Sequence, residues 1–198
     1  MSFAEIKPTE VKTMEAFLSS TLAVAIAEIG DKTQLLTLFL AARFTQRHAI
    51  IMGILVATLI NHAVSALVGN WVIQFVPANV IPWAVGLSFI AVGLWLLIPD
   101  KDEDTDSNTL KYGAFVATCV LFFIAEIGDK TQIATIVLAA KYQAPVAVVA
   151  GSTLGLMLAN VPVVYFGQWI MARVPLHLAR YGACGLFCLL GVLTLIYG

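Results

Sequence analysis

The sequence predicts an all-α membrane protein of six transmembrane helices, arranged as two inverted repeats of three helices each. Composition is the first reason: the 198 residues are 60% hydrophobic and 12% charged, whereas soluble domains carry about 25% charged residues. The second reason is the presence of six apolar segments that are long enough, or nearly so, to span a bilayer, which takes about 20 residues. The third is an eight-residue sequence that occurs twice in the chain.

Short polar connections separate the six predicted spans. These spans cover residues 14–42, 49–76, 80–98, 112–140, 146–174 and 178–197. Four of them exceed the minimum spanning length, so we expect them to tilt or to be broken. The predicted organisation is a polar N-terminal lead-in (1–13), a first three-span repeat (14–98), an acidic cytoplasmic linker (99–111) and a second three-span repeat (112–198).

Six spans place both termini on the same side of the membrane, and the distribution of positive charge then sets the orientation. The side of the first, third and fifth connections carries six basic residues, and the other side carries three: Arg43, Arg47, Lys101, Lys111, Arg173 and Arg180 against Lys7, Lys12 and Lys141. We therefore expect a multi-pass membrane protein with both termini outside the cytoplasm.

The repeated sequence is AEIGDKTQ, which begins at Ala27 and again at Ala125, 98 residues later. The same offset pairs other residues: Gly53 with Gly151, Gly69 with Gly167, Trp71 with Trp169, Pro77 with Pro175 and Gly93 with Gly191. Such self-similarity indicates a duplicated unit. Because each unit has an odd number of spans, the second unit must enter the membrane from the opposite side, which in transporters places the substrate site at the midplane between the halves.

Each copy of AEIGDKTQ places charged residues near the middle of a predicted span. A charge at the bilayer centre costs about 2.5–3.5 kcal/mol on insertion scales, so these side chains must face one another, a cavity or an ion. Glu28 and Asp31 are three residues apart, as are Asp31 and Gln34, which predicts one shared helix face. Gly30 lies between the acids and allows the helix to loosen and to offer carbonyl oxygens as ligands.

Together the two copies offer a hard, all-oxygen ligand set that suits magnesium, calcium or manganese. The predicted metal ligands are Glu28, Asp31, Glu126, Asp129, Gln34, Gln132, Thr33 and Thr131. Four carboxylates and two lysines sum to −4 + 2 = −2, which one divalent cation or two protons would neutralise. This balance predicts exchange of a metal ion for protons. Charges that only pair to hold the halves together are the alternative, but buried ion pairs contribute little to stability.

Two copies of Glu-x-Gly-Asp-Lys/Arg-Thr/Ser in a six-span chain resemble the family of Golgi calcium/manganese transporters and their bacterial relatives, also called the second cation/calcium exchanger family. The resemblance covers essentially the whole chain and is closest to the bacterial manganese exporters of that family. It implies proton-coupled export of manganese across a bacterial inner membrane, with both termini in the periplasm and with calcium as a further candidate ion. It also implies that Glu28, Asp31, Glu126 and Asp129 carry the metal.

Other functions remain as alternatives at this point. A calcium/proton exchanger fits the same ligands, and a passive divalent cation channel fits the same architecture, although a channel does not need a site that is balanced only by metal or protons. An intramembrane aspartyl protease needs two aspartates in unlike contexts, whereas Asp31 and Asp129 have identical neighbours. We therefore expect no enzyme activity, no catalytic residue and no bound cofactor, with Mn²⁺ or Ca²⁺ as the transported ion and H⁺ as the counter-ion.

The expected partners are the divalent ion and the lipid bilayer, in a monomer or homodimer. A net charge of −1 gives no indication of nucleic-acid binding. Asn61, His62 and Asn160 fall within predicted spans, where hydrogen bonds between helices are favoured over contact with the ion. For Lys32 and Lys130, pairing with an acid or snorkelling is likewise favoured over direct contact with the substrate.

Overall fold

The computed structural model describes residues 8–98, 109–173 and 176–197, and these residues form eight α-helices and two short 3-10 helices. Most of the predicted acidic linker lies outside the described residues, as does the start of the lead-in, whose remainder belongs to the first helix. The helices are α1 (Pro8–Ala27), α2 (Lys32–Arg43), α3 (Arg47–Val72), α4 (Ile81–Trp95), α5 (Gly113–Glu126), α6 (Lys130–Tyr142), α7 (Pro145–Arg173) and α8 (Leu176–Tyr197), with 3-10 turns η1 (Ile73–Phe75) and η2 (Thr109–Tyr112).

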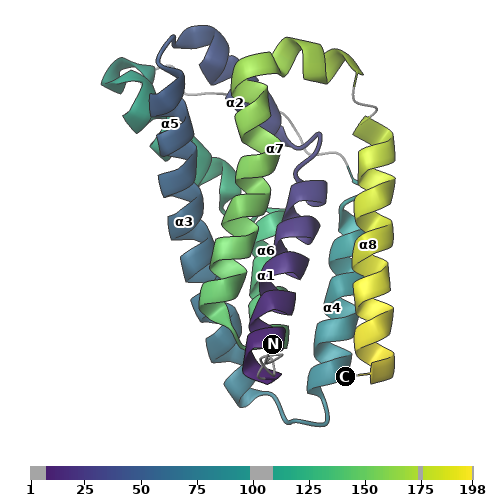
Figure 1. The fold of residues 1–198 in the computed structure, drawn as a ribbon. Coiled ribbons are helices and arrows are strands. Elements are labelled where there is room, and N and C mark those ends of the chain that lie inside the picture. Colours follow the sequence, from purple (N-terminus) through teal and green to yellow (C-terminus); the bar gives the residue numbers. More distant parts are fainter. Residues whose placement is uncertain (1–7, 99–108, 174–175, 198) are drawn as a thin grey trace, which may run out of the picture.

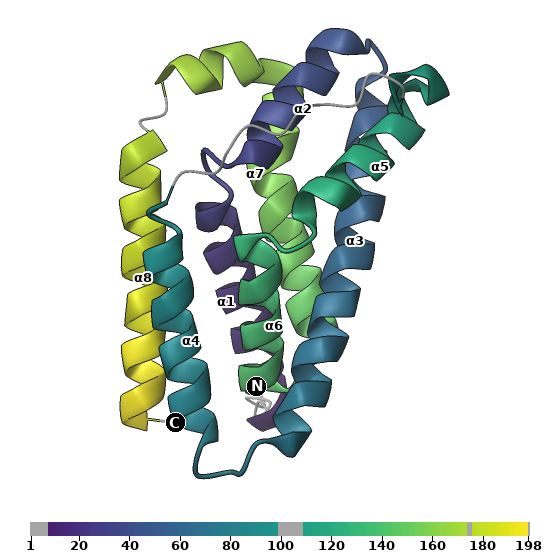
Figure 2. The same cartoon turned by 180° about the vertical axis from the view of Figure 1, so that it is seen from behind.

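The helices pack into one bundle in which α1, α6 and α7 occupy the middle (Figures 1 and 2). On one side of the bundle lie α4 and α8, and on the other lie α3 and α5. The first residues of α1 and the last residues of α8 lie at the same end of the bundle (Figure 1). The connection between α2 and α3 lies at the opposite end, together with the start of α5.

Four of the described helical segments are long and apolar enough to cross a membrane: Arg47–Phe75, Thr109–Glu126, Pro145–Gly167 and Arg180–Tyr197. A fifth candidate is the pair α1 and α2, which meets the same criterion as one broken span with a bend of 71°. Helix α4 is apolar but has only 15 residues. The chain is therefore all-helical in its described part and has four or five helices suited to a bilayer.

The expected break occurs in both copies of the repeated sequence. Helix α1 ends at Ala27 and α2 begins at Lys32, while α5 ends at Glu126 and α6 begins at Lys130. The glycines in the breaks have φ angles of 82° at Gly30 and 73° at Gly128, a left-handed conformation that glycine adopts without steric cost. The chain therefore changes direction at the glycine in each half.

The break corrects one prediction about the acidic residues. Glu28 and Asp31 do not share a helix face, because residues 28–31 are not helical. Asp31 is instead the N-cap of α2, as Asp129 is of α6. The carboxylates are brought to the interior by the turn between two helices and not by the periodicity of one helix.

Small residues allow the helices to approach closely. A methyl group added at Gly53 of α3 would lie 3.0 Å from the carbonyl oxygen of Phe115 in α5. At the equivalent Gly151 of α7, it would overlap the carbonyl oxygen of Phe17 in α1. The first helix of each half therefore packs on the long helix of the other half.

The α4–α8 pair is antiparallel and glycine-mediated. Gly86 lies against the carbonyl oxygen of Gly191, and Gly93 lies against the carbonyl oxygen of Cys184, with added methyl groups at 3.0 and 3.1 Å from these oxygens. Phe89 of α4 also packs edge-to-face on Phe187 of α8, with ring centroids 6.1 Å apart.

The outer surface of the bundle is apolar. Large hydrophobic side chains are exposed along α1, α3, α4 and α8, among them Leu22, Leu67, Leu87 and Leu189. Soluble proteins rarely expose contiguous apolar patches of more than a few hundred Å². This surface is suited to contact with lipid chains.

Candidate metal centre

The two breaks bring their acidic residues together in the interior. Glu28 and Glu126 are completely buried, and Asp129 and Asp31 are almost completely buried. One carboxylate oxygen from each of Glu28, Glu126 and Asp129 lies within 4.8 Å of the others, which is an arrangement that could hold a metal ion. Asp31 lies outside this group of three, but its carboxylate is close enough to interact electrostatically with that of Glu126.

Threonine hydroxyl groups fix part of each carboxylate. Thr33 donates a hydrogen bond of 2.6 Å to Oε2 of Glu28, and Thr131 donates one of 3.2 Å to Oε2 of Glu126. The hydroxyl of Thr131 also donates a hydrogen bond of 3.1 Å to Oδ2 of Asp129. Both threonine hydroxyls therefore contact acidic side chains of this group, and their role as metal ligands stays a prediction.

The second oxygen of each glutamate has no hydrogen-bond partner among the described residues. Oε1 of Glu28 and Oε1 of Glu126 are buried and unsatisfied. An unpaired carboxylate oxygen in a buried place is costly, because neither water nor a donor replaces its lost hydration. A cation or a proton would remove that cost, so the donor set fits a hard divalent ion.

The two glutamines stabilise the turns. The amide oxygen of Gln34 accepts a hydrogen bond of 2.8 Å from the backbone N–H of Gly30, and that of Gln132 accepts one of 2.7 Å from Gly128. Gln34 also donates through Nε2 to the carbonyl of Ala159 in α7, at 3.0 Å. Each glutamine therefore closes its own break, and its role as a metal ligand stays a prediction.

The two lysines of the motifs occupy different surroundings. Lys130 is 3% exposed, and its Nζ donates a hydrogen bond of 2.8 Å to the carbonyl of Ile98, just beyond the end of α4. Lys32 is half-buried, and its positive charge interacts electrostatically with Glu126. The contact with Ile98 could not be found from side-chain types, because it uses a backbone oxygen.

The polar residues in the long helices make hydrogen bonds between helices, as expected. Thr37 of α2 donates to Oδ1 of Asn160 in α7 at 2.7 Å. Asn61 of α3 donates to the carbonyl of Phe123 in α5 at 3.3 Å. His62 lies 3.4 Å from the hydroxyl of Thr153 in α7. Thr37 and Thr153 had no signal in the sequence beyond their position in apolar helices.

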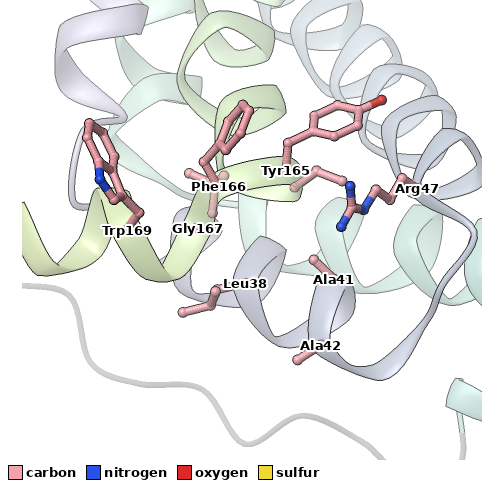
Figure 3. Close-up of a pocket in the computed structure, with 10 residues that line it drawn as sticks. Leu38, Ala41, Ala42, Arg47, Tyr165, Phe166, Gly167 and Trp169 are labelled. Carbon is pink, nitrogen blue, oxygen red and sulfur yellow. The ribbon is translucent and has the colours of Figure 1, made fainter.

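A pocket of about 370 Å³ lies apart from the acidic residues, between the second half of α2 and the end of α7 (Figure 3). Leu38, Ala41 and Ala42 line one side, and the segment 163–167 with Trp169 lines the other. Arg47 is also at its edge, with its guanidinium 5.3 Å from the ring centre of Tyr165. None of the predicted metal ligands lines this pocket.

The chain is similar to proteins of one family over nearly its whole length. The sequence model of the family described as "Divalent cation/proton antiporter GDT1" matches residues 16–104 and 114–198. A protein of Vibrio cholerae serotype O1, named "Putative manganese exporter", is 44% identical over 191 residues, which cover 96% of this chain and 94% of that protein. A GDT1-like protein of Synechocystis is 30% identical over 182 residues, covering 81% and 87% of the two chains. No solved structure matches the chain.

Proposed function

The chain belongs to the GDT1 family of divalent cation/proton antiporters, and from this premise we propose that it exports manganese from a bacterial cell in exchange for protons. Antiport of a divalent cation against protons is the activity of the family. Manganese is favoured as the ion because the Vibrio cholerae relative carries that name and because the ligands are hard oxygens. The transported ion is the substrate, and no enzyme activity or cofactor belongs to this proposal.

The proposed ion site is the meeting point of the two breaks. Glu28, Glu126 and Asp129 provide its centre, and Asp31 completes four carboxylates around it. The observation that carries the assignment is the pair of buried, unsatisfied Oε1 atoms of Glu28 and Glu126 beside a third carboxylate. Thr33, Thr131, Gln34 and Gln132 support the site, as further oxygen ligands or through the hydrogen bonds described above.

Proton exchange follows from competition for the same oxygens. Without metal, the close approach of the carboxylates is unfavourable unless some of them bind protons. A divalent ion must displace these protons in order to bind, and their return releases the ion. The four acids and two lysines leave a formal charge of −2, so either one divalent cation or two protons would balance the site.

We further propose that the chain is built from two inverted repeats of three spans, each with a broken first span. Equivalent helices run in opposite directions through the bundle: α1 and α5, α2 and α6, α3 and α7, and α4 and α8 (Figures 1 and 2). Contacts between the halves are also reciprocal, since Gly53 meets Phe115 and Gly151 meets Phe17. Both facts support a two-fold axis in the membrane plane, which in transporters passes through the substrate site.

The proposed orientation follows the positive charges. Arg43 and Arg47 lie at the end of the bundle that holds the α2–α3 connection, and we place that end in the cytoplasm. The start of α1 and the end of α8 then face the periplasm. The chain works in this proposal as a monomer or a homodimer in the inner membrane.

Reconstituted vesicles test the function directly. An imposed pH gradient alone should drive Mn²⁺ uphill, and Mn²⁺ flux should move protons the other way. The same vesicles with Ca²⁺ in place of Mn²⁺ measure ion preference, and faster transport of Ca²⁺ would make the chain a calcium/proton exchanger. If Mn²⁺ flux does not depend on the pH gradient but does depend on a sodium gradient, the counter-ion is Na⁺ and not H⁺. If the flux depends on neither gradient, the protein is a channel.

A further inference from the structure

Gly69 and Gly167 are equivalent positions in the two halves, but their surroundings differ. A methyl group added at Gly69 in α3 would overlap the carbonyl oxygen of Ile136 in α6 and lie 3.1 Å from Cβ of Ala139. At Gly167 in α7 its nearest atoms belong to side chains, first Cδ1 of Leu38 in α2 at 2.6 Å. The backbones of α3 and α6 are therefore in direct contact, whereas a leucine side chain separates α7 from α2.

The pocket of Figure 3 occupies the looser of these two interfaces. Ala41 and Ala42 line it and are half-buried and exposed, respectively. Their equivalents in the second half, Ala139 and Ala140, are buried, and Ala139 lies against Gly69. The same pair of residues therefore lines an open pocket in one half and a closed interface in the other.

The long helices differ at the same place. Helix α7 has non-helical angles at Phe166 (φ −128°, ψ 19°), one residue before Gly167, and contains Pro162. Helix α3 contains no such interruption between Arg47 and Val72 and has Val64 in place of the proline. Because proline lacks an N–H group and weakens the helix around it, α7 can bend away from α2 at this point.

Each interface is mechanically linked to one side of the ion site. Asp31 is the N-cap residue just before α2, and Asp129 is the N-cap residue just before α6. A shift of α2 against α7, or of α6 against α3, therefore moves an aspartate at the metal centre. Packed interfaces of this type adopt alternative discrete arrangements more readily than they deform gradually.

We propose that the two glycine contacts exchange during transport: the Gly69–Ile136 contact opens when α7 closes on α2 at Gly167. The structure is then one of two arrangements, in which the α2–α7 interface is loose and the α3–α6 interface is closed. In the other arrangement the pocket beside Ala42 is closed, and an equivalent pocket opens beside Ala140. This inference rests on the antiport function proposed above and adds the contacts that decide between the two arrangements.

Opposite effects of two matched substitutions test the exchange. In the full chain with Cys119, Cys184 and Cys188 replaced by alanine, reporter cysteines are placed by Ala42→Cys or Ala140→Cys. Their reaction rates with a water-soluble maleimide are then measured in vesicles. Gly69→Ala cannot coexist with the Ile136 contact, so it should raise the rate at position 140 about tenfold and lower the rate at position 42. Gly167→Ala hinders closure of the pocket, so it should lower the rate at position 140 and raise the rate at position 42.

Gly182 provides the matched control, because a methyl group added there meets nothing within 4 Å among the described residues, and Gly182→Ala should leave both rates unchanged. Rates that do not respond to Gly69→Ala and Gly167→Ala, or that shift in the same direction in both, overturn the exchange. Should Gly69→Ala fail to fold, Gly167→Ala decides alone, since its methyl meets only movable side chains. The maleimide readout does not use transport, so absent Mn²⁺/H⁺ exchange in the parent would contradict the proposed function and not this inference.

Discussion

The hydroxyl of Thr33 donates a 2.6 Å hydrogen bond to one oxygen of Glu28, while the other oxygen of that carboxylate has no hydrogen-bond partner in the described part of the chain. The second half has the same relationship between Thr131 and Glu126, at 3.2 Å. In each half one oxygen is held by the protein, and one is left for an ion or a proton. Binding can then occur without rearrangement of the carboxylate, which keeps the cost of forming the site low.

Substitution of the acids should abolish transport. Alanine at Glu28, Asp31, Glu126 or Asp129 removes a charge from a site that is balanced by a divalent ion. Asparagine at the aspartates should fail nearly as completely, because the shape is kept but the charge is lost. Growth of cells in manganese and Mn²⁺ flux in vesicles measure the effect. Normal manganese resistance with alanine at two of the four positions would contradict the four-carboxylate site.

Substitution of the threonines should weaken ion binding without abolishing it. In Thr33→Val the buried Oε2 of Glu28 loses its donor, a penalty of about 1–3 kcal/mol that corresponds to roughly 5–150-fold in apparent Mn²⁺ affinity. Thr33→Ser keeps a hydroxyl and is the control. Isothermal titration of purified protein with Mn²⁺ gives the affinities, and equal affinities in the valine and serine variants would show that the hydroxyl does not support binding.

The glutamines should contribute unequally to stability. Gln34→Leu loses hydrogen bonds to Gly30 and Ala159, whereas Gln132→Leu loses one, to Gly128. At about 1 kcal/mol for each net hydrogen bond, Gln34→Leu should lower the unfolding temperature in detergent more than Gln132→Leu does. Gln74→Leu is the control, because Gln74 is exposed and donates to the nearby carbonyl of Asn70 within its own helical segment. The reverse order of the two effects would show that the contact with α7 is not stabilising.

Lys130 should anchor the second motif to α4. Lys130→Met removes the hydrogen bond from Nζ to the carbonyl of Ile98 and leaves that carbonyl without this donor, so we expect a loss of about 1–3 kcal/mol in stability. Lys12→Met, at an exposed position of α1, is the control. Thermal unfolding in detergent measures both variants, and an unfolding temperature for Lys130→Met that equals that of the parent would mean that the contact contributes nothing.

Acid should weaken manganese binding. Protons and Mn²⁺ compete for the same carboxylates in the proposed site, so apparent affinity should fall as pH decreases and binding should release protons. Titrations in buffers of different ionisation enthalpy count the protons released. If binding is independent of pH and releases no protons, the metal and the protons do not bind to the same carboxylates.

The sequence predicted that the acidic residues of the two motifs lie together, but not the geometry that brings them there. The exact repeat of AEIGDKTQ identified Glu28 and Glu126 as partners 98 residues apart, because two copies of a charged motif within apolar segments lower their burial cost by meeting at one site. Gly30 correctly indicated a loosened helix. The prediction that Glu28 and Asp31 share a helix face was wrong, because helical periodicity does not apply across the turn that Gly30 makes at positive φ.

Other features depended on tertiary structure alone. The partner of Lys130 is a carbonyl of Ile98, and any residue type offers that group. The bond between Thr37 and Asn160 joins residues 123 positions apart, and two common polar side chains carry no signal of such pairing. The short helix α4 ends within an apolar segment at Trp95, so hydropathy predicted a longer span than the structure contains.

The contact between α4 and α8 has an evolutionary consequence. Gly86 meets Gly191 and Gly93 meets Cys184, and with the offset of 98 residues these are one contact made twice. Such self-complementary pairing is the mark of an isologous interface between two identical subunits. A gene of half the present length, whose product inserted into the membrane in both directions, could have formed this interface as a homodimer. Fusion of two copies would then have freed each half to diverge, and Pro162, which replaces the valine of the first half, is one such change.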